Sequence, residues 1–205
     1  MIGGDRYDVL KFSDTRVAVS LADVVGKGLP AALLMSNLQA AVRAFATSTA
    51  APHDVCGSVN RLLCRNIASG KFVTFCYTVI DLEEGQIAYA NAGHNPPIIV
   101  RASGQIDRLA TTGLVLGVSS DWTYTTGVAP FGPGDRLVCF TNGMTEANSA
   151  AEEEFGEDRL AQLAADAPVG STETLADTLT AAVIAWTDGQ AQDDATLIIV
   201  ERSPV

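Results

Sequence analysis

Long apolar runs and a secretory signal are both missing from this sequence of 205 residues. No stretch reaches the roughly 18 apolar residues that a membrane-spanning helix needs. The first ten residues, MIGGDRYDVL, lack the basic and apolar regions of a signal peptide. A soluble, cytoplasmic protein without membrane insertion is therefore predicted.

Paired cysteines are also missing. The four cysteines form no CxxC pair, and each lies in an apolar stretch where a buried thiol behaves as a small hydrophobic side chain. They are Cys56, Cys64, Cys76 and Cys139. Because redox and zinc sites need closely spaced cysteines, positions in the core are predicted for all four.

Basic residues are scarce, with 13 Lys and Arg against 24 Asp and Glu, and the formal net charge is −11. No cluster of Lys and Arg offsets the repulsion of phosphates, which argues against nucleic acid as a partner. The segment Gly26-Lys27-Gly28 does not fit the pattern GxxxxGK[ST] of a nucleotide-binding loop. The excess of carboxylates is suited instead to attracting divalent cations.

The patterns that are present predict one domain over residues 1–205, with strands in runs and helices in runs. Strands are predicted at 6–12, 16–23, 72–81, 86–93, 97–103, 105–110, 122–129, 135–140 and 195–201. Helices are predicted at 29–46, after His53 or Asp54, at 156–165 and at 172–186. The strands between 72 and 140 are predicted to form an antiparallel meander. This order favours the α+β class, with helices covering an antiparallel sheet system.

Aspartates stand at the ends of several predicted strands. Asp5 and Asp8 lie at the first strand, Asp23 ends the second, and Asp193 and Asp194 precede the last. A single Asp beside Gly at a strand end is usually an ordinary turn residue. Their combination raises the chance of a shared site.

Eight motifs occur in one order along nearly the whole chain. They are GGDRYDV at 3–9, ADVVGKGLPAALLM at 22–35, TFCYTVID at 74–81, ANAGHNPPIIVR at 90–101, GLVLGV at 113–118, GDRLVCFTNGMTEA at 134–147, FGEDRL at 155–160 and DDATLIIV at 193–200. In these motifs the sequence resembles the metal-dependent (PPM, type 2C) protein serine/threonine phosphatases, specifically the bacterial SpoIIE-type branch. The resemblance implies an α/β/β/α sandwich of two antiparallel sheets flanked by helices.

The resemblance also implies a cluster of two or three Mn²⁺ or Mg²⁺ ions. Asp23 and the Val24 carbonyl would hold a metal pair, and Asp5, Asn142 and Asp193 would complete the cluster. Catalysis would depend on Asp23 and Asp193 through a metal-activated water. Such ions take oxygen ligands, so few carboxylates suffice and no His or Cys is required.

Four further residues are candidates for phosphate contact or for positions beside the metals: Asp8, Lys27, Asp194 and His94. An ordinary solvated lysine remains an alternative for Lys27. A structural turn is the alternative for His94, because Asn95 and two prolines follow it. Arg6 and Arg101 are weaker candidates for phosphate contact.

Asn142 departs from the family pattern. The resemblance implies an Asp in a TDG motif here, and TNG replaces one anionic ligand with a neutral carbonyl of nearly the same shape. Alternatively, Asn-Gly marks a tight hairpin turn. Residues 144–154 argue against a hairpin, because they lack the alternation of a returning strand. Natural divergence and a deliberate substitution both remain open.

The implied reaction is hydrolysis of a phosphoserine or phosphothreonine on a small regulatory partner, an anti-anti-sigma factor of the STAS type. The alternative is a pseudophosphatase that binds the phosphoprotein but turns it over poorly because of Asn142. Relatives generally have a strand before GGD, so the chain looks like the catalytic domain of a longer protein with a sensor upstream. An exposed sheet edge would then allow a homodimer.

Overall fold

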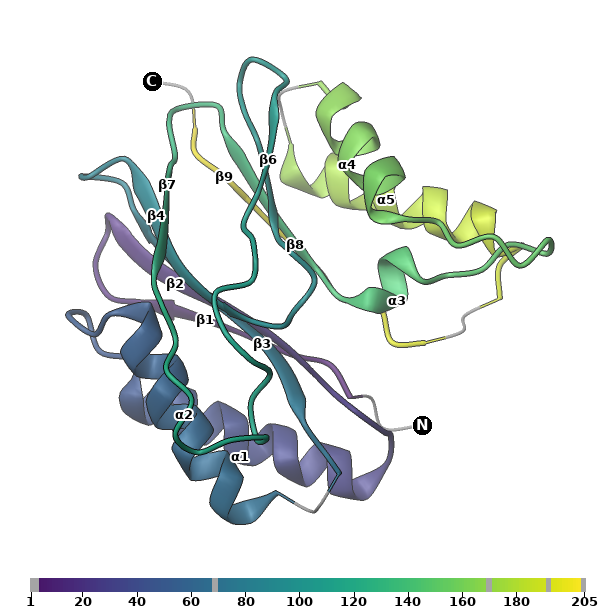
Figure 1. Cartoon of the computed structure of the whole chain (residues 1–205). Coiled ribbons are helices and arrows are strands. Elements are labelled where there is room, and N and C mark those ends of the chain that lie inside the picture. Colours follow the sequence, from purple (N-terminus) through teal and green to yellow (C-terminus); the bar gives the residue numbers. More distant parts are fainter. Residues whose placement is uncertain (1–3, 68–69, 169–170, 191–192, 204–205) are drawn as a thin grey trace. The chain divides into compact units, whose positions relative to one another are not determined.

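The computed structural model describes residues 4–67, 70–168, 171–190 and 193–203, which form two compact units. Unit 1 lies within residues 1–94 and 109–131, and unit 2 lies within 95–108 and 132–205. Each unit has one antiparallel sheet with its own helices (Figure 1). In the described part of the chain, no helix is both long and apolar enough to cross a membrane.

The sheet of unit 1 has five strands in the order β1-β2-β3-β4-β7. They are β1 (Arg6–Lys11), β2 (Arg16–Val24), β3 (Val73–Asp81), β4 (Gln86–Ala92) and β7 (Gly127–Pro130). All neighbours are antiparallel, and β1 lies at the edge. The tight β1–β2 hairpin therefore brings the start of β1 beside the end of β2.

Two helices, α1 (Leu29–Phe45) and α2 (Pro52–Asn66), cover one face of this sheet (Figure 1). Each has a proline in its first turn, where the missing N–H would have no helical acceptor. Leu38 of α1 and Leu63 of α2 share a buried core with Phe75 and Tyr77 of β3. The loop between β2 and α1 is consequently held from both ends.

The sheet of unit 2 has four strands in the order β6-β5-β8-β9. They are β5 (Ile98–Val100), β6 (Ile106–Arg108), β8 (Arg136–Phe140) and β9 (Leu197–Glu201). Helices α4 (Glu157–Asp166) and α5 (Thr172–Trp186) pack on it through a core that includes Val138, Phe140, Leu160 and Leu179. The short helix α3 (Asn142–Thr145) follows β8 directly.

Two predictions about elements are wrong, and one predicted helix begins one residue early. Residues 122–126 form no strand, and only β7 remains of the segment predicted at 122–129. The strands between 72 and 140 do not form one meander, because the β5–β6 hairpin and β8 belong to the second sheet. The second helix begins at Pro52, earlier than predicted, because proline fits the first helical position.

The prediction that the cysteines lie in the core is confirmed for three of the four. All four cysteines are free, three are buried, and Cys64 is half-buried with its Sγ 3.5 Å from Asn60 Oδ1. Burial raises the pKa of the Cys139 thiol to about 12, which keeps it protonated and unreactive at neutral pH. The α+β class is confirmed as well, and each unit supplies one sheet with its own helical layer.

Candidate functional site

One group of predicted ligands lies at the start of β1 and the end of β2. Arg6 pairs with Ala22, so Asp5 and Asp23 come from neighbouring positions at the same end of the hairpin. A Cβ built on Gly4 would lie 3.1 Å from Asp23 Oδ1 and 3.3 Å from Val24 O. Glycine thus leaves an open cradle beside a carboxylate oxygen and a backbone carbonyl.

The end of β2 is fixed from β3. Thr74 is the cross-strand partner of Asp23, and its hydroxyl lies 3.4 Å from the Asp23 carbonyl oxygen and 2.9 Å from Nδ1 of His94. If the hydroxyl donates to the carbonyl, Nδ1 of His94 carries the proton and donates to Thr74. These two hydrogen bonds, from His94 to Thr74 and from Thr74 to Asp23, hold the backbone at Asp23 in place.

His94 is 2% exposed, and the Asn91 side chain bonds both its backbone N–H, at 2.8 Å, and its carbonyl, at 3.1 Å. These contacts favour the structural alternative for His94. Its ring acts on the Asp23 backbone through Thr74. Sequence reasoning missed Thr74, which only the register of β2 against β3 identifies.

Asp8 holds helix α1 against β1. Both its carboxylate oxygens accept from Arg43 in the last turn of α1, at 2.7 and 2.8 Å, and Gln39 lies 3.5 Å away. These bonds lower the pKa of Asp8 below its usual value, led by the hydrogen bond from Arg43. The structure therefore gives Asp8 an anchoring role that was not predicted.

Lys27 lies exposed in the loop between β2 and α1. The loop turns at Gly26 and Gly28, with φ of 104° and 89°, which only glycine adopts readily. A Cβ on Gly26 would lie 2.5 Å from Nζ of Lys71, which donates to the Val25 carbonyl at 2.9 Å. Two lysines thus stand at this loop.

The second group of predicted ligands lies in unit 2. Asn142 and Asp193 line one hollow of about 190 Å³, together with Glu146. The backbone N–H of Thr141 donates to the Thr196 carbonyl at 3.0 Å, and the N–H of Thr196 donates to the Thr141 hydroxyl at 2.9 Å. This reciprocal pair brings the end of β8 beside the segment that precedes β9.

Asn142 begins helix α3, so the hairpin-turn alternative is wrong. Its Nδ2 donates to Glu146 Oε2 at 3.1 Å. Glu146 was missed, although its spacing of four residues from Asn142 would have placed it on the same helical face. The amide therefore faces a carboxylate inside the hollow.

The backbones of Gly143 and Asp194 lie in close contact beside these predicted ligands. A Cβ on Gly143 would lie 1.9 Å from the Asp194 carbonyl oxygen, so only glycine fits. The Asp194 N–H donates to Oδ1 of Asp193 at 2.7 Å. The backbone at residues 193–194 consequently packs directly against α3 at Gly143.

The donor chemistry of both groups fits a hard divalent cation. Carboxylates, an amide oxygen and a backbone carbonyl are the ligands that Mg²⁺ and Mn²⁺ prefer. Within 4–67, 70–168, 171–190 and 193–203, no three His, Cys, Asp or Glu side chains gather into a group that could hold a metal ion. A metal ion at either group would therefore also need the amide oxygen or the backbone carbonyl as a donor.

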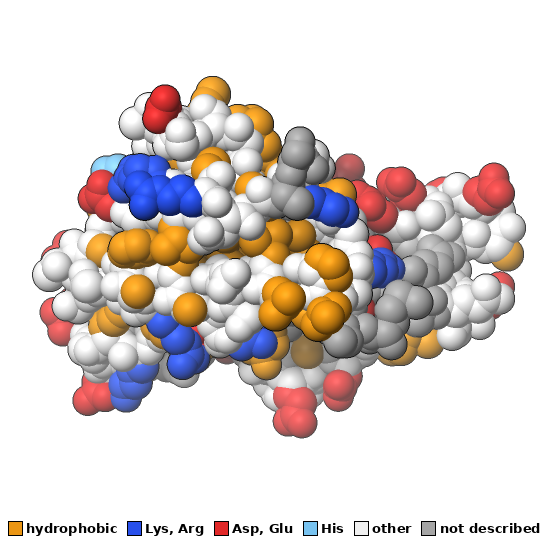
Figure 2. All heavy atoms as spheres, turned by 90° about the horizontal axis from the view of Figure 1, so that it is seen from below, with side chains coloured by type: hydrophobic (Ala, Val, Ile, Leu, Met, Phe, Trp, Pro, Cys, Tyr) orange, Lys and Arg blue, Asp and Glu red, His pale blue; other side chains and the backbone are white. Residues whose placement is uncertain are grey.

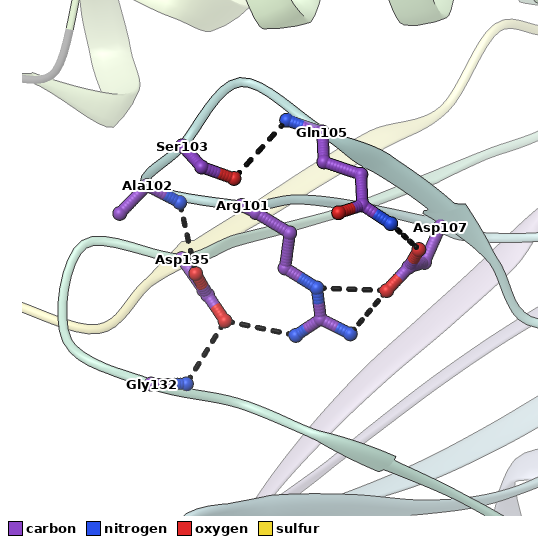
Figure 3. Close-up of polar contacts among 7 residues, drawn as sticks. All are labelled: Arg101, Ala102, Ser103, Gln105, Asp107, Gly132 and Asp135. Atoms are coloured by element: carbon purple, nitrogen blue, oxygen red, sulfur yellow. Dashed lines mark hydrogen bonds and ion pairs between the residues drawn. The ribbon is translucent and has the colours of Figure 1, made fainter.

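Arg101 is committed to a structural network (Figure 3). Its Nε donates to Asp107 at 2.8 Å and its Nη1 to Asp135 at 2.9 Å, while Asp135 also accepts from the N–H groups of Ala102 and Gly132, both at 2.9 Å. The guanidinium is thus neutralised by two carboxylates. These contacts do not support the prediction that Arg101 contacts phosphate.

Asp135→Asn is expected to destabilise the fold by about 2 kcal/mol at neutral pH, because a mostly buried charge-assisted network loses its anion. Burial raises the pKa of Asp135, but the bonds from Gly132, Ala102 and Arg101 outweigh it and the net pKa is lowered. The carboxylate therefore stabilises the fold above the ordinary aspartate pKa of about 4, and this contribution is lost as the pH falls through the folded pKa.

Urea unfolding between pH 7 and pH 3 measures this contribution. The difference between wild type and Asp135→Asn should be constant near neutrality and should shrink below about pH 4. Asp14→Asn, which removes an exposed carboxylate, is the matched control. A difference that persists unchanged at pH 3 would contradict the assignment.

Similarity to known proteins extends over nearly the whole chain. A family model described as Stage II sporulation protein E (SpoIIE) matches residues 13–203. The chain is 31% identical to Protein IcfG of Synechocystis sp., covering 98% of this chain and 36% of that protein. It is 30% identical to Phosphoserine phosphatase RsbU of Bacillus subtilis, covering 98% and 60%. The chain thus spans less than two thirds of these curated relatives.

Solved structures agree with the fold. The RsbU and RsbW domains of Rv1364c from Mycobacterium tuberculosis match with a TM-score of 0.83 and 28% identity, over 99% of this chain and 57% of that chain. The PP2C phosphatase domain of SpoIIE from Bacillus subtilis, with a fragment of its regulatory domain, matches with a TM-score of 0.86 and 19% identity, over 98% and 59%. The predicted fold class is confirmed by these likenesses.

Proposed function

Because this chain belongs to the SpoIIE family, we propose that it is a metal-dependent protein serine/threonine phosphatase. A relative of 30% identity is named a phosphoserine phosphatase, and so is RsbP of Bacillus subtilis, which is 24% identical over 73% of this chain. One family model runs through both units, which supports a single phosphatase domain over residues 1–205.

In this proposal, two or three Mn²⁺ or Mg²⁺ ions are held by Asp5, Asp23, the Val24 carbonyl, Asn142 and Asp193. Bound ions of this kind neutralise charge on the phosphoryl oxygens and lower the pKa of the attacking water. The observation that carries the proposal is the cradle at Gly4, where a carboxylate oxygen and a carbonyl oxygen border one small space.

The other residues support these donors. The carboxylates of Asp23 and Asp193 are the groups on which catalysis depends. The Thr74 hydroxyl holds the Asp23 carbonyl, and His94 holds Thr74. Lys27 supplies positive charge for the phosphate dianion, and the Asp194 N–H orients the Asp193 carboxylate.

The proposed substrate is a phosphorylated regulatory protein of the anti-anti-sigma (STAS) kind in the cytoplasm. An upstream sensor domain would control the activity in a longer protein. A homodimer through the edge strand β1 is proposed as well, since β1 is unpaired on one side among the described strands.

A second candidate function is a phosphoprotein-binding pseudophosphatase. It is favoured by one observation, namely that Asn142 directs its amide group to Glu146 within the hollow that Asp193 also lines. A neutral amide there weakens the attraction for a dication. Binding of phosphoprotein would persist while turnover falls.

Hydrolysis of p-nitrophenyl phosphate with Mn²⁺ tests the proposal. Asp23→Asn should lower kcat/KM by at least about 100-fold, because it removes an anionic donor from the metal site. Asp14→Asn, an exposed carboxylate in the β1–β2 turn, should leave the rate unchanged. Equal rates for wild type and Asp23→Asn, or turnover that survives removal of divalent ions, would refute it.

A further inference from the structure

A groove beside helix α1 is lined mostly by residues that have no role in the chemistry described above. It has a volume of about 280 Å³ and lies wholly within unit 1, between the β2–α1 loop, α1 and the end of α2. Its lining includes Val25, Lys27, Leu33, Leu34, Ile67 and Lys71. We call it the α1 groove. Val24 also lines it, so the groove adjoins the proposed metal loop.

The rim of the α1 groove exposes large apolar side chains. Leu33 is 58% exposed and Val25 is 41% exposed, and the neighbouring Leu29 is 64% exposed. Figure 2 faces α1 and α2 and shows hydrophobic side chains gathered over them, with Lys and Arg close by. Contiguous exposed apolar surface of this kind marks a binding surface more often than it marks a solvated face.

The charge of this segment is opposite to that of the rest of the chain. Residues 25–71 contain five Lys or Arg and one Asp, whereas the remaining residues contain eight Lys or Arg and 23 Asp or Glu. Two of the five, Lys27 and Lys71, border the α1 groove itself. The groove therefore favours an acidic partner with apolar side chains.

We propose that the α1 groove binds the phosphoprotein substrate, through leucine-like side chains of an acidic segment next to the phosphorylated residue. This inference rests on the proposed function and names how the substrate is recognised. The volume suits one or two aliphatic side chains. An occupant in the groove lies beside Val24 and Lys27, so its phosphate can reach the metal loop.

Charge argues against two other occupants. A second copy that presented the same groove would bring Lys27 and Lys71 against the same two lysines. An anionic membrane would attract the lysines of the groove but would repel the 23 acidic residues carried by the rest of the chain. An acidic protein segment is small enough to contact the groove and its two lysines alone.

Two synthetic phosphopeptides test the proposal. Both carry one phosphoserine among Asp and Glu residues; one has leucines three and four positions after the phosphoserine, and the other has alanines there. The leucine peptide should have a kcat/KM about tenfold higher or more, mainly through KM, because its leucines are buried. Leu33→Glu should abolish this preference while changing hydrolysis of p-nitrophenyl phosphate far less.

Ile184→Glu is the matched control, because Ile184 is 55% exposed on α5 of unit 2. It should leave the preference and the basal rate unchanged, and thermal melts should show both variants folded. Equal kcat/KM for the two peptides in the wild type would overturn the proposal. So would a loss in Leu33→Glu that is as large for p-nitrophenyl phosphate as for the leucine peptide.

Fluorescence anisotropy of the labelled peptides separates this inference from the proposed function, because it needs no turnover. Preferential binding of the leucine peptide without any hydrolysis would refute the phosphatase and keep the docking site. Equal binding of both peptides overturns docking. It is also overturned if Leu33→Glu spares peptide binding but abolishes binding to phosphatidylserine vesicles, or dissociates a dimer in sedimentation.

Discussion

Asn142→Asp is expected to strengthen Mn²⁺ binding, and with it phosphoester hydrolysis at limiting Mn²⁺, by about ten- to a thousandfold. The reason is charge, since the variant supplies an anion where a neutral amide now lines the hollow with Asp193. The new carboxylate would stand about where Nδ2 now contacts Glu146, at 3.1 Å. Two carboxylates so close repel each other until a cation separates them.

The variant should therefore be less stable than the wild type without metal and should gain more stability from Mn²⁺. Without metal it should melt at a lower temperature than the wild type, and with Mn²⁺ it should gain more stability than the wild type does. Thermal melts over a Mn²⁺ titration, with p-nitrophenyl phosphate rates in parallel, measure both. Activity that appears only in the Asp form would support the pseudophosphatase for the chain with Asn142.

Asn148→Asp is the matched control, because Asn148 lines the same hollow and gains the same charge. If charge alone attracts the ion, the two variants behave alike. A gain confined to Asn142→Asp identifies position 142 as a ligand. Equal rates for wild type and Asn142→Asp would mean that position 142 is not a required ligand.

Gly143→Ala is expected to cost about 3 kcal/mol of folding stability and to remove metal-dependent activity. The added Cβ would meet the Asp194 carbonyl oxygen at 1.9 Å, and that atom belongs to the backbone and cannot rotate away. Either α3 or residues 193–195 must move. Movement of the latter displaces Asp193, so stability and metal binding should fall together.

Gly132→Ala is the control for this prediction. A Cβ there would meet only Asp135 Oδ2, at an ordinary 3.8 Å, and Gly132 has no positive φ. Urea unfolding and Mn²⁺ titration should find Gly132→Ala close to wild type. A stable Gly143→Ala with unchanged Mn²⁺ affinity would contradict the packing of α3 against Asp194.

Local patterns were sufficient for most elements. Helix α1 was predicted at 29–46 and is found at Leu29–Phe45, and α5 has the predicted bounds, because apolar periodicity acts within one segment. In α1 a proline near the start adds a second local signal. Residues 122–126 failed because β-rich composition does not provide a strand partner. Pairing is decided by chain segments far away in the sequence.

The sequence by itself determined the family, the α+β class and the aspartates at the strand ends, because motifs and periodicity are written within short windows. Only the tertiary structure decided what surrounds those aspartates. The registers of β1 with β2 and of β2 with β3 placed Gly4 and Thr74 beside Asp23, and the packing of α3 placed Glu146 in the hollow with Asp193. Such neighbours are set by hydrogen-bonded register and side-chain packing between distant segments, and no local pattern in the sequence contains them.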